Sequence, residues 1–163
     1  MQAKDVILRT WEANDRIIGM YVEDLQDHEL LIRAVDGMNH IAWQLGHLIL
    51  GERRMIESIR PGVSPALPEG FEEAHDKESA TSDDSGRFLS KAEYRHLAAA
   101  QRQASKEVLA SLSDADLDAP GPEFLRAYAP TVGAVLLMVG THGLLHCGQF
   151  VGVRRKVGKP VLF

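Results

Sequence analysis

The chain has 163 residues, of which 45% are hydrophobic and 25% are charged, with 18 Lys and Arg against 23 Asp and Glu. This length and composition predict one soluble globular domain over residues 1–163, and the net charge of −5 argues against a general nucleic-acid-binding protein. The single cysteine, Cys147, excludes an intrachain disulfide and is typical of a reducing compartment. We expect no signal peptide and no membrane partner, hence a cytoplasmic protein.

Helical periodicity predicts two helices in the first part of the chain. The first runs from about Lys4 to Leu25, where apolar residues recur at steps of three, four and seven on one face, and Asn14 lies on the same stripe. The second follows a turn signal, takes Asn39 as its expected N-cap, and ends near Arg60 before a Pro-Gly pair.

A long connection separates this second helix from the third. Residues 61–90 contain several prolines and glycines and the run TSDDSG. A connection of about thirty residues is unusual in a compact domain, so we expect it to have a function or to carry short helical turns. The third helix begins with a capping box, Ser90 with Glu93, and runs to about Leu112.

The last part of the chain predicts one short turn and one long helix. Ser113 can cap the turn, and the helix extends from about Thr131 to Val157. No segment alternates with period two for long, so no sheet is expected. Four long helices with a long crossover between the second and third predict an all-α four-helix bundle, whose core can hold metal ligands.

Three of the seven histidines lie inside predicted helices with apolar surroundings. His142 and His146 lie one turn apart on one helix face, so two imidazole nitrogens can reach one cation. This HxxxH spacing is a weak signal, because two core histidines or a solvent-facing pair produce it too. His47, taken alone, is more often a core histidine bonded to a backbone carbonyl. If it faces the other two, the three form an open metal site.

Other polar residues are weaker candidates. Gln149 is a candidate to orient a ligand or a metal-bound water, and Gln44 is a second one. Asn14 either faces the same pocket or bonds to a neighbouring helix. Glu52 lies on another helix face and is a poor fourth ligand, and Cys147 is expected to be a packing residue. His40 is a candidate to line the pocket. Surface positions are expected for the remaining histidines and for the basic residues at the end of the last helix: His28, His75, His96, Arg154, Arg155, Lys156 and Lys159.

Three segments resemble a known family, the DinB/YfiT-like superfamily. They are WEANDRIIGMYVEDLQDHEL (residues 11–30), NHIAWQLGHLILGE (residues 39–52) and THGLLHCGQFVGVRRKVGKPVLF (residues 141–163). The resemblance extends over most of the chain but not over residues 61–90. It implies an up-down-down-up four-helix bundle, a homodimer, and a divalent cation, zinc or nickel, held by three histidines that match His47, His142 and His146.

The resemblance also implies a chemistry. Characterised members are thiol-dependent and include a mycothiol-dependent maleylpyruvate isomerase and bacillithiol or related S-transferases. It therefore favours a metal-dependent S-transferase or isomerase of small molecules that uses a low-molecular-weight thiol. A metal-dependent hydrolase is the alternative, although residues 142–146 read HGLLH and lack the glutamate of HEXXH. A third reading is a non-enzymatic, stress-related protein that binds a metal or ligand. The sequence assigns no catalytic residue.

Overall fold

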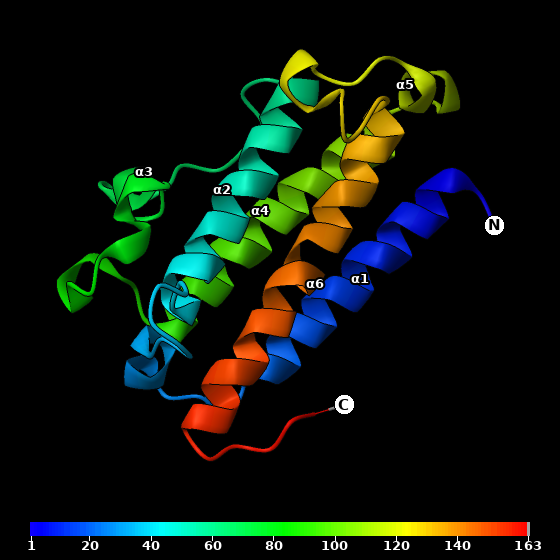
Figure 1. Cartoon of the computed structure of the whole chain (residues 1–163). Coiled ribbons are helices and arrows are strands. Elements are labelled where there is room, and N and C mark those ends of the chain that lie inside the picture. The colour runs from blue at the N-terminus through cyan, green and yellow to red at the C-terminus, as the bar shows by residue number, and fades with distance from the viewer. Residues whose placement is uncertain (163) are drawn as a thin grey trace.

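Four long helices lie alongside one another in the computed structural model of the chain, which describes residues 1–162 (Figure 1). They are α1 (Ala3–Val22), α2 (Ile41–Ile59), α4 (Lys91–Ser111) and α6 (Val132–Lys156). α6 packs against α1 and α2, and α2 also packs against α4. No strand is present within residues 1–162, so the all-α prediction is confirmed.

The helix starts follow the capping chemistry of the sequence, with one correction. The predicted capping box is present, since Ser90 Oγ accepts the Glu93 N–H and the Glu93 carboxylate accepts the Ser90 N–H. The N-cap predicted at Asn39 is wrong. His40 caps α2, and its Nδ1 accepts the N–H of Trp43 at 3.1 Å. The lone pair of a neutral imidazole replaces the amide oxygen expected at this position.

The segment between α2 and α4 folds as short helical turns, as predicted. These are α3 (Phe71–Ala74), η2 (Glu78–Thr81) and η3 (Ser85–Arg87), and α3 contacts α2. Three further short elements are η1 (Asp27–Leu31) after α1, and α5 (Asp114–Asp118) and η4 (Glu123–Leu125) before α6. The crossover therefore lies on the outer side of α2, and it belongs to the packed structure.

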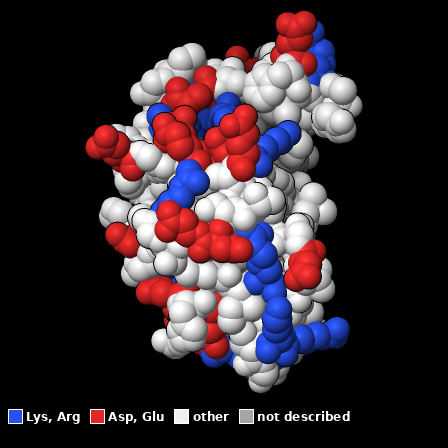
Figure 2. Space-filling view, turned by 60° about the vertical axis from the view of Figure 1, so that its left-hand side comes forward, with Lys and Arg blue, Asp and Glu red and all other residues white. Residues whose placement is uncertain are grey.

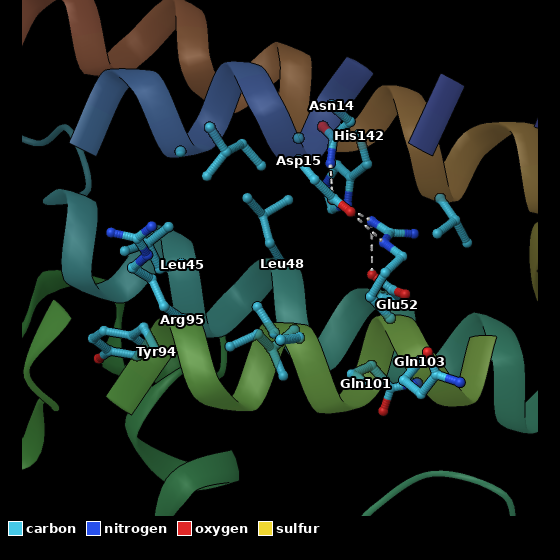
Figure 3. Close-up of a pocket in the computed structure, with 18 of the residues that line it drawn as sticks. Asn14, Asp15, Leu45, Leu48, Glu52, Tyr94, Arg95, Gln101, Gln103 and His142 are labelled. Carbon is cyan, nitrogen blue, oxygen red and sulfur yellow. Dashed lines mark hydrogen bonds and ion pairs between the residues drawn. The ribbon is translucent and has the colours of Figure 1, made fainter. Parts of the chain in front are cut away.

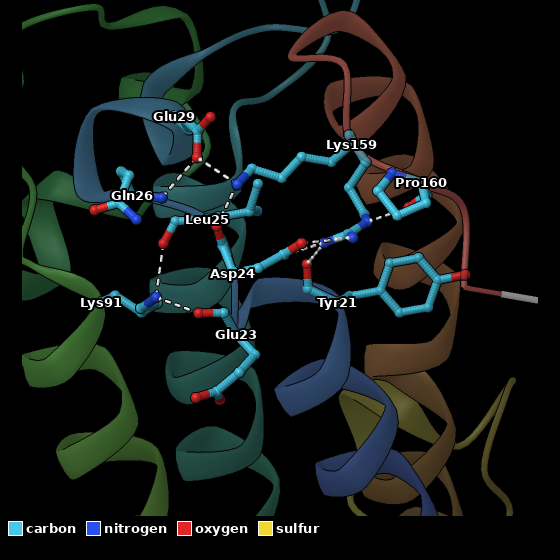
Figure 4. Close-up of polar contacts among 10 residues, drawn as sticks. Tyr21, Glu23, Asp24, Leu25, Gln26, Glu29, Lys91, Lys159 and Pro160 are labelled. Atoms are coloured by element: carbon cyan, nitrogen blue, oxygen red, sulfur yellow. Dashed lines mark hydrogen bonds and ion pairs between the residues drawn. The ribbon is translucent and has the colours of Figure 1, made fainter.

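At the basic end of α6, Arg155 and Lys156 are exposed as predicted, but the surface position predicted for Arg154 is wrong. The Arg154 side chain is fully buried, and its guanidinium pairs with Asp24 at 2.6 Å and 3.1 Å. It also donates to the carbonyls of Tyr21 and Pro160, at 2.8 Å and 2.9 Å (Figure 4). Lys159, half-buried, lies 3.5 Å from a Glu29 carboxylate oxygen. These contacts join the ends of α1 and α6, because a buried guanidinium needs both a counter-charge and acceptors.

Small residues let α1 and α6 approach closely. A Cβ at Gly143 would lie 2.2 Å from Asn14 Oδ1, and one at Gly140 would lie 2.7 Å from the Trp11 ring.

α6 is also long and apolar enough to cross a membrane on length and composition alone, a criterion that the core helix of a soluble protein meets too. On the face shown in Figure 2, acidic and basic side chains are interspersed.

Candidate metal centre

The structure brings the three predicted histidines together between α2 and α6. One ring nitrogen from each of His47, His142 and His146 lies within 4.8 Å of the other two. The Nε2 atoms of His142 and His146 are 3.3 Å apart. Two nitrogens bonded to a tetrahedral zinc at about 2.0–2.1 Å are about 3.3 Å apart, so the separation suits one shared cation. The three-histidine group could therefore hold a metal ion.

Burial keeps these imidazoles in the form that binds metals. Desolvation, with a smaller contribution from the nearby His142, lowers the pKa of His47 and of His146 to about 4. Burial also lowers the pKa of His142. At pH 7 the three rings are neutral, so no bound proton has to be displaced before a ring nitrogen donates its lone pair to a cation.

Gln44 determines which nitrogen of His146 carries the proton. Its Nε2 donates to the Asn39 carbonyl at 2.6 Å, which fixes the orientation of the amide. Its Oε1 therefore accepts from His146 Nδ1, at 2.9 Å. The proton on Nδ1 leaves the Nε2 lone pair directed at His142. The sequence suggested Gln149 first and Gln44 second as residues that orient groups at the site. At the His146 ring, Gln44 has this role.

Trp43 holds His47, a contact that the sequence interpretation missed. The two rings stack with centroids 4.7 Å apart and planes inclined by 12°. The indole Nε1–H donates to the Asp76 carbonyl at 3.0 Å and lies 3.3 Å from Ser79 Oγ. The crossover thus fixes Trp43, and Trp43 limits the rotation of the His47 ring. The sequence does contain a signal for this contact, because Trp43 and His47 are four residues apart and so lie on one face of α2.

His75 is buried, so the surface position predicted for it is wrong. Its Nδ1 lies 2.8 Å from the Phe71 carbonyl and its Nε2 lies 2.7 Å from the Tyr94 hydroxyl. A carbonyl can only accept, so Nδ1 donates to it and Nε2 accepts the tyrosine proton. The ring lies against Gly46, where a Cβ would come within 2.1 Å of it. With both nitrogens paired, the ring can be buried at little cost.

The other histidines and Cys147 are not part of the three-histidine group. His40 is fully buried at the start of α2 and is not among the residues that line the pocket beside His142. His28 and His96 are exposed, as predicted. Cys147 is buried, and its burial raises the pKa of the thiol to about 12, so the prediction of a packing residue is confirmed.

A cavity of about 360 Å³ lies between α1, α2, α4 and α6, with His142 on its wall (Figure 3). Asn14 also lines it, and its amide donates to the neighbouring Asp15 at 3.3 Å rather than to another helix. Glu52 lies apart from the three histidines, as its helical angle predicted, and pairs with Arg102 at 3.1 Å. Arg102 was not recognised from the sequence, because one arginine on a polar helix looks like a surface residue.

Comparison with known proteins identifies the family. Residues 10–150 match the family described as the DinB superfamily. No curated protein matches the chain. The matched range contains α2, α4, parts of α1 and α6, and all three histidines of the candidate centre. The chain therefore belongs to the DinB superfamily.

Proposed function

We propose that this protein binds one zinc or nickel ion through His47, His142 and His146 and uses it for thiol S-transfer or isomerisation of small molecules. The observation that carries the proposal is the convergence of three neutral imidazoles whose pKa values are lowered by burial. Three neutral ligands do not reduce the charge of a divalent ion. The bound ion would therefore supply the positive potential that ionises a bound thiol near neutral pH.

The protein's own contribution would be to hold the three rings in place. Gln44 keeps the Nε2 lone pair of His146 available, and Trp43 restrains His47. Gly51 lies beside His142, and a Cβ there would be in van der Waals contact with that ring at 3.4 Å. Residues that orient metal-binding histidines in this way raise affinity by reducing the number of ring orientations.

Hydrolysis is the less favoured reaction because Glu52, a carboxylate on the wall of the cavity beside His142, is already engaged. Glu52 pairs with Arg102 at 3.1 Å and accepts the Ser105 hydroxyl proton at 2.6 Å. A general base must have an unoccupied oxygen within reach of the attacking water. Activation of a thiol needs no such base beyond the ion itself.

The proposal also includes the arrangement that the family resemblance implies. We take the chain as one domain in which the four long helices form an up-down-down-up bundle, and the protein as a cytoplasmic homodimer. Leu137, Leu144 and Leu145 of α6 are exposed large apolar side chains on the monomer, the last at 74%. Exposed apolar groups of this kind are typical of association surfaces.

Metal analysis of the purified protein tests the centre. We expect one divalent ion per chain, and loss of that ion from each of His47→Ala, His142→Ala and His146→Ala. His96→Ala is the matched control, since His96 is exposed and should leave metal content unchanged. Full metal content in all three site variants would show that the assignment is wrong.

A conjugation assay on metal-loaded protein tests the reaction. Thiol consumption is measured with mycothiol, bacillithiol or glutathione against a panel of small electrophiles, with the triple alanine variant as the control. We expect consumption that requires both the metal and the thiol. Thiol-independent ester cleavage would instead favour the hydrolase, and no turnover in either assay would favour a binding protein.

A further inference from the structure

The cavity beside His142 opens to solvent between α1 and α4. Ala98 and Ala99 of α4 line it and are exposed, and their short side chains leave the space between the two helices unfilled. This opening gives a small molecule a route into the bundle. An open groove on the outer surface continues from the cavity, and three residues line both: Asp15, Gly19 and Arg95.

The interior of the cavity is mainly apolar and has room for a two-ring molecule. Figure 3 shows Leu48 projecting from α2 into the space between α1 and α4. The volume of about 360 Å³ is somewhat more than twice the roughly 150 Å³ that holds one benzene ring. The apolar part of a ligand should therefore have about ten to twelve carbon atoms. Further apolar residues that line the cavity are Ile18, Val22, Leu45, Ile49 and Val139.

The two carboxylates on the wall are already engaged, so they offer no free partner to a cationic ligand. Arg102 makes two hydrogen bonds to Asp15, both at 3.1 Å, and an ion pair with Glu52 at 3.1 Å. Glu52 also accepts the Ser105 hydroxyl at 2.6 Å, and Asp15 accepts the Asn14 amide at 3.3 Å. All four carboxylate oxygens therefore have a donor.

The charges around the cavity also balance in number. The cationic side chains that line it are Arg95, Arg102 and Lys106. Arg95 pairs with Glu23 at 2.8 Å, so these three cations are matched by three carboxylates, those of Glu23, Asp15 and Glu52. Lys106 is only half-buried, and its long side chain lets the ammonium group stay in solvent. A ligand with a net charge of either sign would therefore lack compensation, and the cavity suits an uncharged molecule.

His142 connects this cavity to the candidate metal centre. Of the three histidines, only His142 lines the cavity, and its Nε2 lies 3.3 Å from the Nε2 of His146. A molecule bound in the cavity would therefore contact a ring that also belongs to the centre. The cavity and the centre are thus two parts of one site, which share a single side chain.

We propose that the cavity binds the second substrate of the metal centre, an uncharged and largely apolar small molecule that enters between α1 and α4. The assignment rests on the proposed function, in which the ion itself binds the thiol. It adds the chemical class of the molecule that meets the thiol.

Calorimetric titration of the metal-free protein measures binding in the cavity alone. The probe is 2-naphthalenemethanol, and 2-naphthylmethylamine and 2-naphthoate carry the same rings with a positive or a negative charge. We expect one alcohol per chain at pH 7.5, bound at least about tenfold more tightly than either charged probe, because an unpaired charge is costly to remove from water. No binding of the alcohol, or equal or tighter binding of a charged probe, would overturn the proposal.

Two variants that fill the cavity locate the binding site. Leu48→Trp and Ala98→Trp introduce a large side chain from α2 and from α4, and each should weaken binding of the alcohol at least about tenfold. Ala92→Trp is the control, because Ala92 is exposed on α4 and does not line the cavity. Unchanged binding by both filling variants, with their folds verified by circular dichroism, would place the alcohol elsewhere and contradict the proposal.

Loading with Co²⁺ separates failure of this inference from failure of the proposed function. The visible absorption spectrum of bound Co²⁺ reports changes around the ion, and the alcohol should alter it in the unaltered protein but not in Ala98→Trp. A spectrum that stays the same when the alcohol is bound would show that the cavity does not serve the centre, and the inference alone would fail. If Co²⁺ does not bind at all, the proposed centre fails and the inference fails with it.

Discussion

The amide of Gln44 is decisive for the chemistry of the candidate centre. It is fully buried, accepts from His146 Nδ1 and donates to the Asn39 carbonyl, so neither the amide nor the ring can turn without losing a buried hydrogen bond. Through these two bonds the start of α2 controls which ring nitrogen on α6 can bind a cation. Trp43 has the corresponding role for His47, by stacking rather than by hydrogen bonding.

Replacement of Gln44 should weaken metal binding without removing a ligand. Gln44→Met keeps the volume and removes the acceptor, so His146 can adopt the other tautomer, and we expect metal affinity to fall by about 10–100-fold. Competition with a chromogenic chelator measures this change. Gln149→Met is the matched control and should bind metal as the unaltered protein does. An affinity that Gln44→Met leaves unchanged would exclude the orienting role.

At the scale of elements, the crossover is part of the framework of the site. His75, at the end of α3, bonds to Tyr94 of α4 and lies against Gly46 of α2. Further along the crossover, the Asp76 carbonyl and Ser79 Oγ accept the indole N–H of Trp43. The crossover therefore connects α4 to the face of α2 that carries His47. This packing requires the absence of a side chain at Gly46.

A methyl group at Gly46 should displace the crossover. In Gly46→Ala the new Cβ would lie 2.1 Å from the His75 ring, so the ring must move and its bond to Tyr94 should break. We expect a loss of about 1–3 kcal/mol in the free energy of unfolding, measured in urea. Gly19→Ala is the control, since no atom lies within 4 Å of its Cβ position, and it should be neutral or stabilising by up to about 1 kcal/mol. Equal stability of the two variants would contradict this packing argument.

At the scale of the whole molecule, the buried histidines make stability depend on pH. Burial lowers the pKa of five of them, and two of the five, His40 and His75, lie outside the candidate centre. Protonation of a buried ring removes an accepted hydrogen bond, such as that from Tyr94 to His75 or from Trp43 to His40. The folded chain therefore binds fewer protons than the unfolded chain below pH 6.5.

The metal-free protein should accordingly lose stability as the pH falls from about 6.5 towards 4. The lowered pKa values contribute stability that is complete above pH 6.5, with a slope of at most about 1.4 kcal/mol per pH unit for each histidine. Glu52, whose pKa is raised, opposes this trend as a single group. Urea unfolding at pH 7.5 and pH 5 measures the difference. His75→Gln should reduce the slope and the exposed His96→Gln should not, whereas a stability independent of pH would refute the prediction.

Much of the fold and the core of the candidate site follow from local patterns. Helical periodicity and caps predicted the four long helices, because a repeat of 3.6 residues and a capping box depend on residues adjacent in the chain. The spacing of His142 and His146 placed their rings on one face for the same reason. The addition of His47 came from the family resemblance, since nothing in the local pattern of α2 states which helix it faces.

What the sequence by itself determined is therefore the helices, their order and the residues each can present on a face. Only the tertiary structure decided the partners: Gln44 for His146, Tyr94 for His75, and Asp24 for a buried Arg154. These pairs join residues 19 to 130 positions apart. The physical reason is that a polar side chain is buried or solvated according to the groups that face it, and those groups come from other helices.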